Sequence, residues 1–194
     1  MVTQMSKKQK NNGALGRSAF FFALGLIFCL GPALAGADQL SEHHYLKFDP
    51  HTQKMVDAKV FKEINNFFHD AEAAIEAKNM DALMGLYSDS YINGPHNKES
   101  VKKIWESIFS NFSGLATIHN MRFITTSAAN NVMIIRCSGI LMGIPKGEDG
   151  LIALDNWVDN DHVLVNEDGK WRLMGSSGKE QKRFWFDKPL HPLF

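Results

Sequence analysis

Hydrophobic residues between positions 56 and 112 recur at steps of three and four, which is the period of an amphipathic helix. The first stripe predicts a helix from about Val56 to Lys78. Asn79 is a good helix cap and predicts a second, short helix that extends to Tyr87, and Asn97 can cap a third helix. The first stripe contains Val60, Ile64, Phe67, Phe68, Ala71, Ala74 and Ile75, and the third helix has Val101, Ile104, Trp105, Ile108, Phe109 and Phe112.

After Gly114 the hydrophobic period changes from helical to two, which is typical of β-strands. Asp168 and Gly169 form a strong hairpin signal between the last two strands. Three helices followed by successive strands indicate an α+β fold and exclude a repeating βαβ parallel sheet. The predicted strands are Thr117–Thr126, Asn131–Met142, Leu151–Val165 and Lys170–Met174.

The N-terminus has the features of an export signal. Four basic residues, the last of them Arg17, precede an uncharged run, SAFFFALGLIFCLGPALAGA, at residues 18–37. Gly31 and Pro32 break the run, and Ala33-Leu34-Ala35 offers small residues for cleavage near Gly36. We therefore expect a periplasmic or secreted protein. The alternative is an uncleaved membrane anchor, because the run approaches the roughly 20 residues that a spanning helix needs.

Charge and cysteine content narrow the possible partners. The chain has 21 basic and 21 acidic residues, and cleavage would remove four basic residues (21 − 4 = 17), leaving a formal charge of −4. Nothing in this balance favours nucleic acid as a partner. Cys137 would be the only remaining cysteine, which excludes an internal disulfide, and we expect it to be a buried, inert thiol. His43, His44 and His51 fall in a polar segment that we read as a solvated arm.

Two stretches carry a family resemblance: FHDAEAAIEAKNMDALMGLYSDSY at residues 68–91 and VLVNEDGKWRLMG at residues 163–175. They resemble the nuclear transport factor 2-like (NTF2-like) superfamily, in its SnoaL-like or ketosteroid-isomerase-like branch. The resemblance implies an α+β cone, in which three N-terminal helices pack on a curved antiparallel sheet around a pocket. It also implies a homodimer through the outer sheet face. Where isomerase members carry a catalytic aspartate, this chain has Asn93, which cannot be a carboxylate base but can orient a ligand carbonyl.

The chain is thereby divided into four predicted parts. A signal peptide covers residues 1–35 and an extended arm covers residues 36–55. The NTF2-like (SnoaL-like) domain covers residues 56–178, and a tail of aromatic and basic residues covers residues 179–194.

The stretch DNWVDNDH, residues 155–162, is the most suggestive of a site. Strand alternation places His162 on one face together with Leu164, Trp171 and Leu173, and extending it backwards adds Ile152, Leu154, Asn156, Val158 and Asn160. Asp155, Asp159 and Asp161 would then point outwards, beside Trp157, as solvated acids. A metal site of the D-x-D-H type would need a β-bulge to re-aim one side chain, so we predict no metal.

Candidate site residues follow from polar groups on otherwise apolar faces. His119 alternates onto one face with Thr117, Met121 and Phe123. Each histidine has a plain alternative as a core or rim imidazole, and Trp105 as a core residue. We predict no cofactor. The candidate catalytic residues are His162, His119 and Tyr91, and the candidate ligand-binding residues are Asn93, Asn156, Asn160, Phe68 and Trp105.

Three functions are compatible with these features. The first is an exported protein that binds a small, largely apolar ligand in the cone. The second is a lyase or isomerase with His162 or His119 as general base and Tyr91 or Asn93 holding an oxyanion. The third is an interaction module that dimerises through an outer sheet face carrying Trp157, or that associates with a membrane if the signal is not cleaved.

Overall fold

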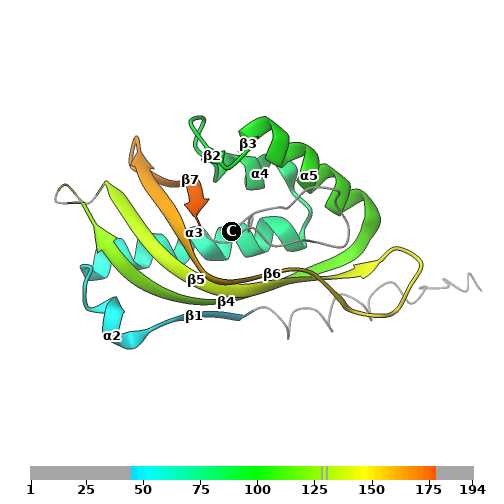
Figure 1. The fold of residues 1–194 in the computed structure, drawn as a ribbon, viewed down its shortest axis with the longest axis horizontal. Helices are drawn as coiled ribbons and strands as arrows, with labels where there is room; N and C mark the ends of the chain where they lie inside the picture. The colour runs from blue at the N-terminus through cyan, green and yellow to red at the C-terminus, as the bar shows by residue number, and fades with distance from the viewer. Residues whose placement is uncertain (1–44, 128, 130, 178–194) are drawn as a thin grey trace, which may run out of the picture. The chain divides into compact units, whose positions relative to one another are not determined.

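The computed structural model describes residues 45–127, 129 and 131–177 (Figure 1). The predicted signal peptide, His43, His44 and the predicted C-terminal tail lie outside the described residues. The elements are β1 (Tyr45–Phe48), α2 (Pro50–Gln53), α3 (Ala58–Glu76), α4 (Met80–Gly85), β2 (Ile92–Asn93), β3 (His96–Asn97), α5 (Lys98–Asn111), β4 (Phe112–Thr126), β5 (Val132–Pro145), β6 (Ile152–Glu167) and β7 (Lys170–Ser177).

The three predicted helices are confirmed as α3, α4 and α5. The side chain of Asp57 accepts a hydrogen bond from the backbone of α3, and Asn79 does the same for α4, because both satisfy amides that have no partner within the helix. At the start of α5, Asn97 and Ser100 form a reciprocal capping box. The predicted boundaries are correct to within two residues for α3 and α4.

The main sheet has five strands in the order β1-β4-β5-β6-β7. Strands β4 to β7 form the predicted antiparallel meander. Strand β1 is an addition, because the segment read as an extended arm pairs in parallel with β4, from Tyr45 opposite Ile118 to Phe48 opposite Met121. His51 lies in the short helix α2 that follows.

The sheet curves around α3, and α4, α5 and the β2–β3 hairpin lie on the same side of it (Figure 1). Helix α3 contacts β4 and β7, so its apolar stripe and the inner sheet face make one core. Among the described residues, no helix has both the length and the apolar character needed to cross a membrane. The buried apolar residues of α3 are Ile64, Phe67, Phe68, Ala71, Ala74 and Ile75.

Strand β6 contains two irregularities that change which side chains face the core. Cys137 pairs with Asn160 but Gly139 pairs with Trp157, so β6 has one residue more than β5 over this interval. The extra residue is accommodated at Asp159, whose φ of 53° is left-handed. A second shift, between Leu141 and its neighbour Met142, occurs near the start of β6.

The predicted faces of β6 are therefore right from Asn160 onwards, wrong between the two shifts, and right again at Ile152 and Leu154. Asn160 and His162 are buried, as predicted. Asp155 and Trp157, which were expected to point outwards, are only 7% and 2% exposed. Asn156 was expected on the inner face but is exposed, and Val158, expected there too, is 67% exposed. One inserted residue inverts the alternation, since the side-chain period of a strand is two.

Candidate functional site

The inner face of the sheet brings several polar side chains together because β4, β5 and β6 are in register. Residues directly opposite one another on neighbouring strands have their side chains about 5 Å apart. The register produces three adjacent rows: His119, Gly139 and Trp157; then Met121, Cys137 and Asn160; then Phe123, Ile135 and His162.

Helix α3 closes over these rows with Phe68. The ring centroid of Phe68 lies 5.9 Å from that of His119 and 6.1 Å from that of His162. Three residues that the sequence singled out are thus brought together, with Asn160 two positions from His162 on the same face of β6. We refer to His119, Cys137, Trp157, Asn160, His162 and Phe68 as the inner cluster.

His162 is completely buried, with 0% of its surface exposed. Its Nδ1 lies 3.1 Å from Oγ of Ser176 on β7, which is the residue opposite it in the sheet. Burial lowers the pKa of His162 to about 4, although the neighbouring charge of Asp161 acts in the opposite direction. The imidazole is therefore neutral at pH 7, and its Nε2 has no hydrogen-bond partner within the described part of the chain.

Asn160, in the row next to His162, also has a buried side-chain nitrogen without a hydrogen-bond partner among the described residues. Its side chain is 2% exposed, and Nδ2 makes no hydrogen bond to any described residue. Leaving such a buried group unpaired costs about 1–3 kcal/mol. Two unsatisfied nitrogens, one on Asn160 and one on His162, therefore lie on the same face of one strand, where a ligand oxygen would satisfy them.

A second set of contacts links His119, Cys137 and Trp157. Nδ1 of His119 is 3.4 Å from Sγ of Cys137, and the indole N–H of Trp157 donates to the same sulfur at 3.1 Å. Burial raises the pKa of the Cys137 thiol to about 12, so it stays protonated. The predicted burial of this thiol is confirmed.

Gly139 makes the contact between Trp157 and Cys137 possible. A Cβ at this position would overlap the indole ring of Trp157 and the carbonyl oxygen of Ile118. The absence of a side chain allows the indole to lie across β5, with its ring 5.3 Å from that of His119. A glycine inside a strand often marks such a close approach, so Gly139 is the signal in the sequence that could have indicated this contact.

Two further candidates, Tyr91 and Trp105, belong to a separate aromatic group around Tyr87. Tyr91 packs edge to face on Tyr87 at 4.9 Å, and the indole N–H of Trp105 donates to the Tyr87 hydroxyl at 3.0 Å. Burial raises the pKa of Tyr91 to about 12, while the nearby side chain of Asn93 lowers it, so the phenol is neutral. Tyr87 was not predicted as a site residue.

This aromatic group is connected to the inner cluster through β7. The carbonyl of Ile92 in β2 occupies the space that a side chain on Gly175 would fill. Gly175 is followed by Ser176, which bonds His162. Asn93, next to Ile92, is buried at 2% exposure, so β2 carries it against the strand that supports His162.

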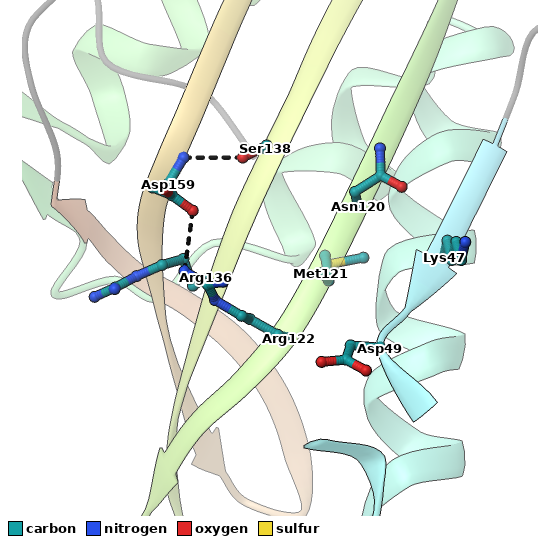
Figure 2. Close-up of a pocket in the computed structure, with 8 residues that line it drawn as sticks. All are labelled: Lys47, Asp49, Asn120, Met121, Arg122, Arg136, Ser138 and Asp159. Carbon is teal, nitrogen blue, oxygen red and sulfur yellow. Dashed lines mark hydrogen bonds and ion pairs between the residues drawn. The ribbon is translucent and has the colours of Figure 1, made fainter. Parts of the chain in front are cut away.

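The outer face of β4, β5 and β6 has a different chemistry. Arg136 binds Asp161 through two contacts of 2.6 and 2.9 Å, and Arg122 binds Asp159 at 3.1 Å. The backbone N–H of Asp159 donates to Oγ of Ser138 at 2.9 Å, as Figure 2 shows. A pocket of about 250 Å³ lies here, beside β1. Two of the cations that line this pocket, Arg122 and Arg136, are thus already paired with acids.

The structure also shows which candidates stay outside the inner cluster. Asn156 is exposed on β6 and cannot contribute to a buried site. Trp157 is buried and gives no support to a dimer through the outer face, so the homodimer stays a prediction. Within the described ranges, no group of three histidine, cysteine, aspartate or glutamate residues could hold a metal ion.

Comparison of the sequence with models of protein families and with curated proteins finds no match. Solved structures do match. A putative scytalone dehydratase from Novosphingobium aromaticivorans has a TM-score of 0.54 at 14% identity, over 68% of this chain and 91% of its own. Aln2 from Streptomyces sp. has a TM-score of 0.53 at 7% identity, over 62% and 90%. A putative aromatic ring hydroxylase from Novosphingobium aromaticivorans has a TM-score of 0.51 at 13% identity, over 62% and 88%.

These structures share the arrangement of helices on a curved sheet. The chain therefore has the NTF2-like fold that the sequence predicted. At identities this low, the likeness extends to the fold alone.

Proposed function

We propose that the protein binds a small, largely apolar ligand on the inner face of the sheet, and that Asn160 and His162 recognise one oxygen atom of this ligand. The observation that carries the proposal is the pair of buried nitrogens, Nδ2 of Asn160 and Nε2 of His162, which have no partner among the described residues. Apolar surroundings with a few placed polar groups are typical of ligand sites.

The charge state of the site favours an uncharged ligand. His162 is neutral because burial lowers its pKa to about 4, and Tyr91 is neutral because burial raises its pKa to about 12. Cys137 remains a thiol for the same reason. A buried carboxylate or ammonium on the ligand would need an opposite charge, which these three groups do not provide. A ketone or an alcohol needs only a hydrogen bond.

The test uses pairs of ligands that differ in a single oxygen. Aliphatic, monocyclic and bicyclic ketones are each compared with the alkene in which a CH₂ group replaces the carbonyl oxygen, and binding is read as a rise in melting temperature. We expect at least one ketone to bind about tenfold or more tightly than its alkene, as one buried hydrogen bond of about 1.4 kcal/mol would produce. If no ketone exceeds its alkene, the proposal is wrong.

Two variants assign the preference to the site. Asn160→Leu removes the buried amide and should abolish the preference for the ketone, while the empty protein becomes equally or more stable because an unpaired polar group is lost. Asn156→Leu changes an exposed asparagine on the same strand and should leave the preference intact. A preference that persists in Asn160→Leu would place the binding elsewhere.

A lyase or isomerase with His162 as general base is the second candidate. It is favoured by the unpartnered Nε2 of His162, and by the ability of the Ser176 hydroxyl to donate to or accept from Nδ1. A pKa near 4 makes the imidazole a weak base. The test is exchange of the α-hydrogens of a bound ketone for deuterium in D₂O, which wild type should accelerate and His162→Gln should not. Equal rates in both would exclude this role.

A further inference from the structure

We propose that Cys137 is a positioning residue that holds His119 as a neutral imidazole with its proton on Nε2, which makes His119 a fixed hydrogen-bond donor. The two histidines of the inner cluster then have different roles. The sequence offered both as alternative general bases, and nothing in their spacing separated them.

The first argument counts the hydrogen bonds of the sulfur. The indole N–H of Trp157 points to Sγ at 3.1 Å, and the backbone N–H of Asn120 is also directed at it. A thiol sulfur is a weak acceptor with one hydrogen to donate. That hydrogen has an acceptor if Nδ1 of His119, at 3.4 Å, is unprotonated. If Nδ1 carried a proton instead, three donors would converge on one sulfur, and the thiol hydrogen would lose its acceptor.

The second argument concerns charge. The alternative pairing is a thiolate beside an imidazolium, as in nucleophilic cysteine sites. Cys137 is 0% exposed and His119 only 2% exposed, so both charges would have to be held away from water. Burial is the main cause of the raised pKa of the thiol, and the hydrogen bonds from Trp157 and Asn120 only reduce the shift. The neutral pair is therefore the stable one.

The third argument concerns the orientation of the ring. His119 lies between the indole of Trp157, at 5.3 Å, and the ring of Phe68, at 5.9 Å. Gly139 keeps the indole close to β5. A ring flip that exchanged the nitrogens of His119 would have to displace these neighbours in a packed core. The contact between Nδ1 and Cys137 is therefore held by packing on both sides.

His162 provides the contrast. Its Nδ1 faces the hydroxyl of Ser176, which can donate or accept, so this contact does not select a tautomer. Nε2 of His119 then requires an acceptor opposite it. If the proposed ligand binding holds, on which this step rests, the ketone oxygen selects the Nε2–H form of His162, whereas a general-base role would need Nε2 of His162 unprotonated.

The experiment reads the tautomers directly. The full chain is labelled with ¹⁵N-histidine, and long-range ¹H–¹⁵N correlation spectra are recorded at pH 7.5 without ligand, with the His119 signals assigned by their loss in His119→Gln. We expect a neutral His119 with its proton on Nε2. A proton on Nδ1, or on both nitrogens, would overturn the proposal.

Three variants test whether Cys137 selects this form. Cys137→Ser keeps a donor, and because the N–H groups of Trp157 and Asn120 occupy the acceptor positions of its oxygen, it should keep the tautomer. Cys137→Ala should let the Nδ1–H form of His119 appear without changing His162. Ser176→Ala is the matched control and should change the signals of His162 alone. An unchanged His119 tautomer in Cys137→Ala would refute the role of the thiol, and if that variant does not fold, wild type and Cys137→Ser decide. Because no ligand is present, the result is independent of the ketone test.

Discussion

The two halves of strand β6 differ in how far they follow the alternation of their sequence. From Asn160 to Glu167 the buried residues are those that the hairpin turn predicts. From Asp155 to Val158 the pattern is inverted, and an aspartate and a tryptophan replace an asparagine and a valine on the inner face, while Leu154, beyond the second shift, is buried as predicted. The inversion starts at Asp159, where the extra residue is inserted. Alternation thus predicts side-chain direction only as far as the first bulge.

The largest expected effect tests the inversion itself. Trp157→Ala should lower the free energy of unfolding by about 3–5 kcal/mol, because it empties a buried volume and removes a hydrogen bond to Cys137. Val158→Ala should change it by about 0.5 kcal/mol or less, since this side chain is mostly exposed. Urea unfolding measures both. A larger loss for Val158→Ala would mean that the alternation runs unbroken.

The next largest loss of stability is expected from a side chain at Gly139, because the indole of Trp157 occupies the space beside this glycine. Gly139→Ala should cost about 3 kcal/mol, because the new methyl overlaps the backbone oxygen of Ile118, which cannot move aside easily. The control is Gly85→Ala in α4, where the methyl meets nothing within 4 Å; it should be neutral or stabilise by up to about 1 kcal/mol.

Combining Gly139→Ala with Trp157→Ala gives a double-mutant cycle. The glycine substitution should cost less when the indole is absent. Strictly additive losses would show that Trp157 does not lie over Gly139.

A third effect, on the pH dependence of stability, is expected from His162, which lies in the half of β6 that follows the predicted alternation. His162 has a pKa of about 4 in the folded protein against 6.5 for an ordinary histidine, so the unfolded chain binds the proton more readily. The part of the free energy of unfolding that depends on a neutral His162 is fully present above about pH 6.5 and is lost as the pH falls towards 4. At pH 5 the loss should be about 2 kcal/mol.

Unfolding of wild type and His162→Gln at pH 7.5 and pH 5 isolates this contribution. Wild type should lose more stability than the variant between the two values. Other titrating groups, such as Glu72 with its raised pKa, are common to both proteins and cancel. An equal loss in both would show that His162 is not held neutral.

The smallest effect is expected at the bulge. Asp159→Val should cost about 1 kcal/mol, because a β-branched residue is strained at a φ of 53°. Asp159→Asn keeps a residue that tolerates this conformation and loses only an exposed ion pair with Arg122, worth about 0.5 kcal/mol. Thermal unfolding compares the two. A larger loss for Asp159→Asn would indicate that the ion pair, and not the backbone, determines the bulge.

Most of the fold was predictable because it is recorded in local patterns. The three helices have clear stripes and caps, and Asp168-Gly169 fixes the hairpin of β6 and β7. Strand β1 was not predictable in this way, since its partner is β4, far along the chain, and its own four residues show no period. The resemblance to NTF2-like proteins supplied the curvature of the sheet.

The site was predictable only in part. His119, His162, Asn160 and Phe68 were identified as polar or large groups on apolar faces, and the structure brings them together. Asp155 and Trp157 were placed on the wrong face because a bulge has no fixed sequence signal. The contact between Cys137 and His119 depends on the register of β4 and β5, which periodicity does not supply.

Strand β1 has a further consequence for how the protein behaves when it opens. Only four residues of β1 pair with β4, and the pairing closes a loop of about 70 residues, which is costly in chain entropy. Phe48 stacks on Phe123 at 5.3 Å and packs edge to face on Phe61 at 5.4 Å, and these apolar contacts help to hold the strand in place. When β1 detaches, the edge of β4 is free to pair with another chain. Phe48 therefore limits self-association of the protein. Its substitution would increase aggregation before it lowered the melting temperature.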